Sequence, residues 1–388
     1  MRHVQTAPSD TAVQVSAKRP GGGWSLTILA KRTYRIDDAG QMAPAAEQLG
    51  IVALPQWDPE RPELLIADLE TYTHKLRTDV VVQGHVYGDG AARRLVAEVA
   101  VAGRTVRMQA LGERRCTLGR TGGIVFSEPT PIERVPLRYT HAYGGRDAAY
   151  EAIHGNPLRG DPVYAGMTER EIDAASPYLY PRNPAGRGYL IEATRAAVEA
   201  LELPQLEDPL DPLTLARIVV GDFMEWYRMP LPQGTGWIDY DWYPRIAFLG
   251  VVPICERFAA PPAEVTRGLV PAELTAGDGK KPPNHALEVS NGAAPALQVP
   301  HLRGGEPVAL VHLHPRRSRW ELRVPPAPAM AIDARNGGVR AVEPVLHTLQ
   351  IEPDLGRVTV VWRGEGPALR RYLPQELATM PMRVAWGS

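Results

Sequence analysis

The side chains best suited to chemistry lie between Asp222 and Arg245, where carboxylates alternate with three tryptophans and three tyrosines. Glu225, Asp239 and Asp241 are the candidate catalytic carboxylates. Two carboxylates that flank a glycosidic bond perform glycoside hydrolysis, and neighbouring aromatic rings suit a sugar substrate. The segment therefore favours a carbohydrate-active hydrolase as one hypothesis. Because that chemistry depends on how far apart the carboxyl groups lie in space, ordinary aromatic packing around satisfied carboxylates stays open as the alternative.

A second candidate is the pair His312 and His314. Alternate residues of a strand point to the same face, so this spacing can offer two imidazoles to a metal ion. No third ligand follows nearby in the sequence, whereas a structural zinc ion takes four. The pair is therefore more typical of a half-exposed strand face that ends at Pro315.

The sequence lacks the motifs of common catalytic classes. Residues 119–123 are rich in glycine but lack the GKS or GKT of a P-loop, and residues 186–188 do not form GxGxxG. The serines lack the GxSxG elbow of hydrolases, and no HExxH zinc motif occurs. We therefore expect a protein that is not an enzyme, with no catalytic residue, no bound metal and no cofactor.

The composition is typical of a folded protein without a strong overall charge. Among 388 residues, 44% are apolar, and 43 basic side chains nearly balance 44 acidic ones. No global field therefore attracts nucleic acid or an anionic membrane. Two cysteines, Cys116 and Cys255, exclude a disulfide scaffold and a cysteine zinc ribbon. Without an apolar signal core or the roughly 18 apolar residues of a membrane span, we expect a cytoplasmic protein.

Strands must position most of these side chains, because apolar and polar residues alternate near both ends of the sequence. Residues 24–36 form one expected strand, and residues 78–87 another, in which Gly84 indicates a bulge or a close backbone approach. Residues 345–351 and 357–362 flank a Pro-Asp-Leu-Gly turn, which predicts a β-hairpin. We therefore predict a mainly β fold with antiparallel, sandwich-like sheets and a few short helices.

Proline and glycine interrupt the middle of the chain. Many of the 38 prolines and 36 glycines fall in a long irregular insertion at about 128–230, in which residues 213–228 form an expected helix. The insertion is expected to belong to an N-terminal β-rich lobe over residues 1–258. A linker or peripheral loop follows at 259–300, and a smaller C-terminal β lobe occupies 301–388.

A series of short motifs in a fixed order resembles one protein family. The motifs are residues 31–34, 67–69, 78–85, 136–139, 142–147, 183–189, 243–245, 297–300, 302–306 and 357–364. In this order and spacing they resemble the domain-of-unknown-function family 2169. The resemblance extends from about residue 20 to about residue 370, which is nearly the whole chain.

Members of that family are encoded beside type VI secretion spike proteins and are regarded as adaptors that load toxic effectors onto the VgrG–PAAR spike tip. The resemblance therefore implies a non-catalytic bacterial adaptor or chaperone that binds the N-terminal or PAAR-like region of an effector. The VgrG–PAAR spike is a further implied partner, whereas nucleic acid and membrane are not. A structural component of the injected spike is a third class, beside the adaptor and the hydrolase.

The family has no accepted catalytic residues, so its motif positions carry over without roles. Their residue types nevertheless indicate a structural use. The glycines supply positive φ or close backbone packing, Asp79 hydrogen-bonds arginine or backbone amides, and Asn183 before a proline forms an Asx turn. Such contacts can hold a long irregular segment against a sheet. The motif positions are Lys31, Arg32, Tyr34, Asp79, Gly84, Gly144, Gly145, Asp147, Asn183, Gly186, Gly188, Pro244, Arg245 and Trp362.

Overall fold

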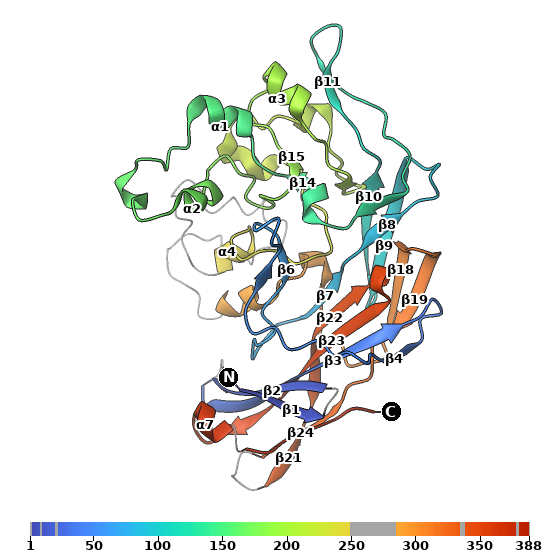
Figure 1. Cartoon of the computed structure of the whole chain (residues 1–388), viewed down its shortest axis with the longest axis vertical. Helices are drawn as coiled ribbons and strands as arrows, with labels where there is room; N and C mark the ends of the chain where they lie inside the picture. The colour runs from blue at the N-terminus through green and yellow to red at the C-terminus, as the bar shows by residue number, and fades with distance from the viewer. Residues whose placement is uncertain are drawn as a thin grey trace.

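The computed structural model describes residues 2–7, 10–19, 22–248, 285–333, 338–377 and 380–387. The fold is mainly β, with 39% strand and 15% helix, as the alternation of residue types predicts. Two large sheets share one apolar core, and short helices and loops cover one end of the molecule (Figure 1).

The first large sheet has eight strands in the order β1-β2-β3-β23-β22-β7-β17, with β4 beside β3. The strands are β1 (Arg2–Ala7), β2 (Asp10–Lys18), β3 (Trp24–Ile36), β4 (Met42–Pro44), β7 (Thr78–Val82), β17 (Gln298–Val299), β22 (Pro344–Glu352) and β23 (Arg357–Ala368). Neighbours are antiparallel except β22 and β7, which are parallel. Every residue of β7 is buried, and its three consecutive valines at positions 80–82 replace the alternating pattern of a half-exposed strand.

The second large sheet has five antiparallel strands in the order β16-β10-β9-β18-β19. The strands are β9 (Arg94–Val101), β10 (Arg104–Leu111), β16 (Leu206–Glu207), β18 (Pro307–His314) and β19 (Arg317–Arg323). Ala102 and Gly103 connect β9 to β10 with φ of 50° and 76°, the pattern of a type I′ turn.

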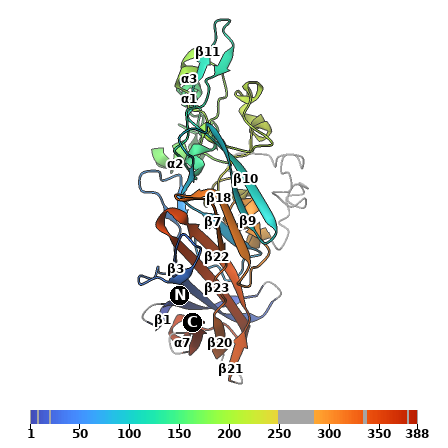
Figure 2. The same ribbon diagram turned by 90° about the vertical axis from the view of Figure 1, so that its right-hand side faces the viewer.

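Smaller sheets complete the β structure. One has three strands, β21 (Val339–Val342), β20 (Ala329–Asp333) and β24 (Met382–Ala385), and four are pairs: β5 (Gln56–Trp57) with β6 (Leu65–Ala67), β8 (His85–Tyr87) with β13 (Arg134–Pro136), β11 (Cys116–Leu118) with β12 (Ile124–Phe126), and β14 (Tyr143–Gly144) with β15 (Arg187–Gly188). The β11–β12 hairpin projects from one end of the molecule (Figures 1 and 2).

The described helices are short. The α-helices are α1 (Ala148–His154), α2 (Glu169–Ala174), α3 (Arg195–Ala200), α4 (Arg245–Phe248) and α7 (Pro374–Leu377), and the 3₁₀ turns are η1 (Tyr139–His141), η2 (Pro162–Tyr164), η3 (Leu215–Arg217), η4 (Phe223–Arg228), η6 (His285–Ser290), η7 (Pro295–Leu297) and η8 (Pro353–Leu355). The helix expected at 213–228 is wrong, because Gly221 takes a φ of 77° and separates η3 from η4. No helix in the described part of the chain is long and apolar enough to cross a membrane.

Two apolar clusters divide the interior. The larger one lies between the two large sheets and contains buried residues of both, including Val99, Leu310 and Trp362. The other one lies among loops and short helices and is built from aromatic rings such as Tyr180 and Trp226. We call the two large sheets the sheet half, and residues 137–245 the irregular half.

The local strand predictions fare differently. The hairpin is confirmed: β22 and β23 pair antiparallel, and Gly356 takes the left-handed conformation with φ 55° and ψ 46°. The strand expected at 78–87 is instead two strands, because Gly84 has a φ of 157° and β7 and β8 belong to different sheets.

Strands from both predicted lobes belong to the same two large sheets. Strands β18 and β19 extend the sheet that β9 and β10 begin, and β22 and β23 lie between β3 and β7. The division at residues 258 and 301 stays a prediction, and strands from both sides of it complete the same two sheets. Residues 259–284 of the predicted linker lie outside the described residues, and 285–300 form η6, η7 and β17.

Candidate functional site

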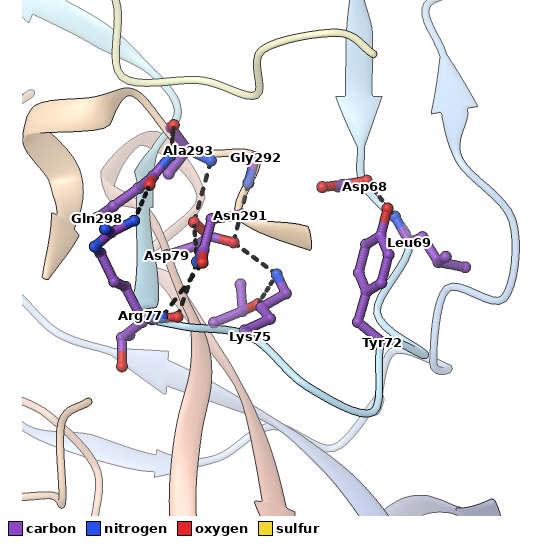
Figure 3. Close-up of polar contacts among 12 residues, drawn as sticks. Asp68, Leu69, Tyr72, Lys75, Arg77, Asp79, Asn291, Gly292, Ala293 and Gln298 are labelled. Atoms are coloured by element: carbon purple, nitrogen blue, oxygen red, sulfur yellow. Dashed lines mark hydrogen bonds and ion pairs between the residues drawn. The ribbon is translucent and has the colours of Figure 1, made fainter. Parts of the chain in front are cut away.

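Asp79, one of the motif positions, has a buried carboxylate that lies among several hydrogen-bonding partners (Figure 3). It begins the buried strand β7 and is fully inaccessible to solvent. Its oxygens accept from Lys75 Nζ at 2.6 Å, Asn291 Nδ2 at 3.0 Å and the Ala293 amide at 3.2 Å. The backbone-amide contacts match the expectation from sequence, whereas the cation is a lysine rather than an arginine. The carboxylate thereby joins the segment of residues 75–79 to residues 291–293.

Arg245 forms a second buried centre beside the first. Its guanidinium donates to Asp68 Oδ2 at 2.9 Å and to the carbonyl oxygens of Ile238 and Val289 at 2.7 and 2.8 Å. The guanidinium also lies 4.0 Å from the ring centroid of Tyr240, whose hydroxyl donates to Asp68. Burial and the Asp68 carboxylate raise the pKa of the Tyr240 hydroxyl. The planar fork of arginine therefore fastens three segments at once.

The first motif on β3 contributes a third buried ion pair. Lys31 Nζ lies 2.7 Å from Glu70 Oε1 and donates to the Gly50 carbonyl at 2.9 Å. Of the other two motif residues on β3, Tyr34 is buried in the sheet core and the Arg32 guanidinium lies 4.6 Å from the Trp386 ring centroid. Lys31 thus holds the loop of residues 50–70 against the sheet.

Glycines bring two loops into contact in the irregular half. Gly144 and Gly188 form register partners in the parallel pair β14–β15, with φ of 149° and 95°. A Cβ on Gly144 would overlap the Asn183 carbonyl, and one on Gly145 would meet the Gly186 carbonyl. Positive φ and close approach are what the sequence indicated for these positions.

Asn183 and Asp147 complete this contact with side-chain to backbone hydrogen bonds. Asn183 Nδ2 donates to the carbonyl oxygens of Tyr139 and Tyr143 at 2.8 and 3.0 Å. Its Oδ1 has no partner, so the expected Asx turn is wrong and the side chain acts as a donor. Asp147 caps α1 by accepting from the Tyr150 amide and also accepts from the Ile191 amide at 2.8 Å.

The remaining motif positions are also structural in their surroundings. A Cβ on Gly84 would lie 2.9 Å from the Asp354 carboxylate, which accepts from the Tyr87 hydroxyl. Pro244 follows a cis peptide bond at Tyr243, and Trp362 is fully buried on β23. The structure therefore gathers the motif positions into buried ion pairs, glycine contacts and core packing, and each hydrogen-bonding partner named above belongs to the chain itself.

In the aromatic–acidic segment of residues 222–245, each candidate carboxylate either is bonded to a neighbouring side chain or is exposed to solvent. Glu225 Oε2 lies 2.7 Å from Arg228 Nη1, and Asp239 Oδ2 accepts from the Trp57 indole at 2.5 Å. Burial raises the pKa of Asp239, against the effect of the Trp57 hydrogen bond. Asp241 is exposed. The three tryptophans of the segment are buried in the apolar clusters, so none offers an open face to a sugar.

The histidine pair on β18 does not share a strand face. The register of β18 against β19 shifts between Val311 and His314, and His312 takes a φ of 57°. This bulge breaks the alternation on which the metal hypothesis depended. His314 is buried against the Trp320 ring, with its Nε2 3.7 Å from Asp38. Within the described ranges, no group of three or more His, Cys, Asp or Glu side chains is placed to hold a metal ion.

Sequence reasoning missed several partners in the buried centres. Lys75 and Asn291 hold Asp79, and Asp68 holds Arg245. The chain has only five lysines, and two of them, Lys31 and Lys75, are buried in ion pairs. That rarity is a signal that could have pointed to Lys75, whereas nothing in the spacing pointed to Asn291.

Comparison with known proteins identifies the family. The family DUF2169, described as an uncharacterized protein conserved in bacteria, matches residues 22–363. The match covers most of the chain, which therefore belongs to this family. No curated protein and no solved structure matches the chain.

Proposed function

We propose that this chain, as a member of the DUF2169 family, is a non-catalytic bacterial adaptor in the cytoplasm that binds a type VI secretion effector and helps to load it onto the VgrG–PAAR spike. Family membership is the premise, and the secretion context is what the resemblance to this family implies. The partner region is the N-terminal or PAAR-like part of the effector. The adaptor acts as a chaperone by holding that region until loading.

One observation carries the proposal: the polar motif residues are bonded to other parts of the same chain. Asp79 and Arg245 each join segments far apart in the sequence, and both are buried and hydrogen-bonded. Catalytic groups must reach a substrate, whereas buried and satisfied groups fix a shape. A shape built from irregular segments suits a protein that binds another protein over the roughly 800 Å² per partner of a specific interface.

The test is affinity purification of the chromosomally tagged protein from its native bacterium, followed by mass spectrometry. The expected result is the co-purification of a toxin-bearing or PAAR-containing protein, and truncation of that partner then locates the contact. An untagged strain is the control. A preparation that contains the chain alone contradicts the proposal and makes a glycan turnover screen the next step, for the hydrolase hypothesis. Recovery of the chain in the secreted fraction together with the spike would instead assign it to the spike.

A further inference from the structure

A groove of about 1060 Å³ is lined by residues of both large sheets. One side consists of β3, β4 and the turn between them, and the other of the β9–β10 turn, the start of β18, and β19 with the loop that follows it. Trp386, near the C-terminal end of the sequence, also lines the groove. The volume lies at the upper limit of the usual range for small-molecule sites, so several residues of a chain fit into it.

The charged side chains that line the groove are unbalanced. Arginines line it at positions 32, 104, 319 and 323, whereas Glu321 is its single acidic lining residue and pairs with Arg319, its Oε1 lying 2.7 Å from Arg319 Nε. The whole chain is close to neutral, so this is a local concentration of positive charge. A concave surface of one sign attracts a partner of the opposite sign.

Neutral contacts orient two of these guanidinium groups. Arg104 Nη1 donates to the Gln298 carbonyl at 3.1 Å, and Arg323 Nη1 donates to the Gly305 carbonyl at 2.9 Å. A backbone carbonyl fixes a guanidinium without cancelling its charge. Each arginine has five N–H donors, so these contacts leave donors for a bidentate bond to a carboxylate. Both side chains belong to exposed residues.

The floor of the groove is apolar. Tyr34, Leu322 and Val324 are buried there, and Met42 and Trp386 are partly buried. A ligand that contacts both the arginines and the apolar floor of the groove therefore combines carboxylates with apolar side chains. Free inorganic anions or a purely acidic polymer would leave the floor uncovered.

At the centre of β19, a ligand must be bound by side chains, because it cannot pair with this strand as an added strand. This strand is the edge of its sheet, and an open edge can accept a partner strand. Gly40, in the turn between β3 and β4, closes on the Glu321 carbonyl so tightly that a Cβ would overlap it. The turn therefore occupies the edge at this point, and the arginines remain the accessible recognition groups.

We propose that this groove binds an extended acidic segment of the effector, with its carboxylates paired to Arg104 and Arg323 and its apolar side chains on the floor. The inference rests on the proposed adaptor function for the identity of the partner. The chemistry of the segment, acidic residues alternating with apolar ones, follows from the lining of the groove alone.

A binding assay on the full chain tests the chemistry of the groove. The probe is a short fluorescent peptide in which glutamate alternates with leucine, and a peptide with lysine in place of glutamate is its counterpart. We expect saturable binding of the acidic peptide alone, weakened by salt and reduced at least about tenfold in R104E/R323E. The matched control is R115E/R120E, which makes the same charge change at two exposed residues next to and within the projecting β11–β12 hairpin. Equal binding by both variants, or no binding by the wild type, overturns the proposal.

The same variants distinguish a failure of the groove proposal from a failure of the proposed adaptor function. In the affinity purification, the expected result is that R104E/R323E loses the effector while R115E/R120E retains it. If R104E/R323E retains the effector, the groove is not its site and the adaptor function stands. If the wild type captures no effector but shows the charge-dependent peptide binding, the adaptor function fails and the groove stands as an acidic-peptide site. A dimer that R104E/R323E abolishes would assign the groove to a second copy of the chain and overturn the proposal.

Discussion

The sheet half and the irregular half of the molecule are held together in different ways. In the sheet half, β3 pairs with β23 along residues 24–35 and 357–368, and aliphatic side chains fill the space between the sheets. In the irregular half, the longest described helix has seven residues. Its loops are joined by single side chains such as Asn183 and Asp147, and by glycines whose neighbours leave no space for a Cβ.

This difference predicts different tolerance to substitution. A ladder distributes its stability over many similar hydrogen bonds, each with a net value of about 1 kcal/mol, so no single residue decides the structure. A loop that depends on one donor or one glycine has no neighbouring contact to replace it. Substitutions at a few positions of the irregular half should therefore cause large losses of stability. Single substitutions in the strand ladders of the sheet half should each cause a small loss.

The largest effect is expected for Gly144→Ala. The new methyl would overlap the Asn183 carbonyl, and the residue has a φ of 149°, so both sterics and backbone conformation oppose it. We expect a loss above the roughly 4–5 kcal/mol that marks exceptional substitutions, measured as the free energy of unfolding in urea by tryptophan fluorescence. Gly155→Ala is the control, since φ 71° and ψ 158° also disfavour alanine but the site is open, and it should cost about 1–3 kcal/mol. Equal losses would show that the close contact does not matter.

A smaller but still large effect is expected where β7 of the sheet half contacts the loop of residues 291–293, for Asp79→Ala. The substitution leaves Lys75 Nζ buried without its carboxylate, which costs about 3–5 kcal/mol. The comparison is Glu199→Ala, which breaks the exposed pair with Arg195 and should cost at most about 0.5 kcal/mol. The double variant K75M/D79L removes both charges and should recover much of the lost stability. A double variant as unstable as the single one would contradict this explanation.

The contrast between regular strands and contacts made by single residues also explains which features the sequence could predict. The strand pattern and the 345–362 hairpin follow from local alternation and turn residues, and the structure has both. The pairing of β23 with β3 joins residues more than 300 positions apart, and no local pattern specifies it. The glycines at 144, 145 and 188 indicated positive φ by their type, and they have it.

The polar partners were harder to predict than the backbone. Asp79 meets Lys75, four residues before it, and Asn291, more than 200 positions away, and residue types alone do not state either pairing. The position of Gly84 indicated an irregularity in a strand, but the change of sheet that follows it depends on Asp354 and on the pairing of β8 with β13. The bulge at His312 has no signal in the spacing of the two histidines.

An intermediate effect is expected from acidification, which acts on buried neutral histidines near the centre of the first sheet. Burial lowers the pKa of His74 to about 4, and burial together with Lys75 and Arg363 lowers that of His347 well below its usual value. The unfolded chain, with histidine pKa values near 6.5, therefore binds more protons than the folded one between about pH 6.5 and 4. Stability present above pH 6.5 is lost as the pH falls through this range.

The variant His347→Leu isolates one contribution to that loss. Both ring nitrogens of His347 are buried without a hydrogen-bond partner, so an apolar side chain of similar size should cost little at pH 7. The measurement is urea unfolding of the variant and the wild type at several pH values from 7 to 5. The two curves of stability against pH should converge towards low pH or cross. Parallel curves would show that His347 does not contribute to the pH dependence.

The smallest effect is a gain, and it tests whether the sheet half can be strengthened locally. Ala102 has a φ of 50° in the turn between β9 and β10, a conformation that costs an alanine free energy and that asparagine adopts more readily. Asn-Gly is the favoured pair in a type I′ turn, and residue 102 is exposed. We therefore expect Ala102→Asn to raise the free energy of unfolding by about 0.5 kcal/mol. Thr105→Asn, three residues further along and also exposed, lies in β10, where asparagine is disfavoured, and should lower it. A gain from both would mean that polarity rather than turn geometry stabilises this edge of the sheet.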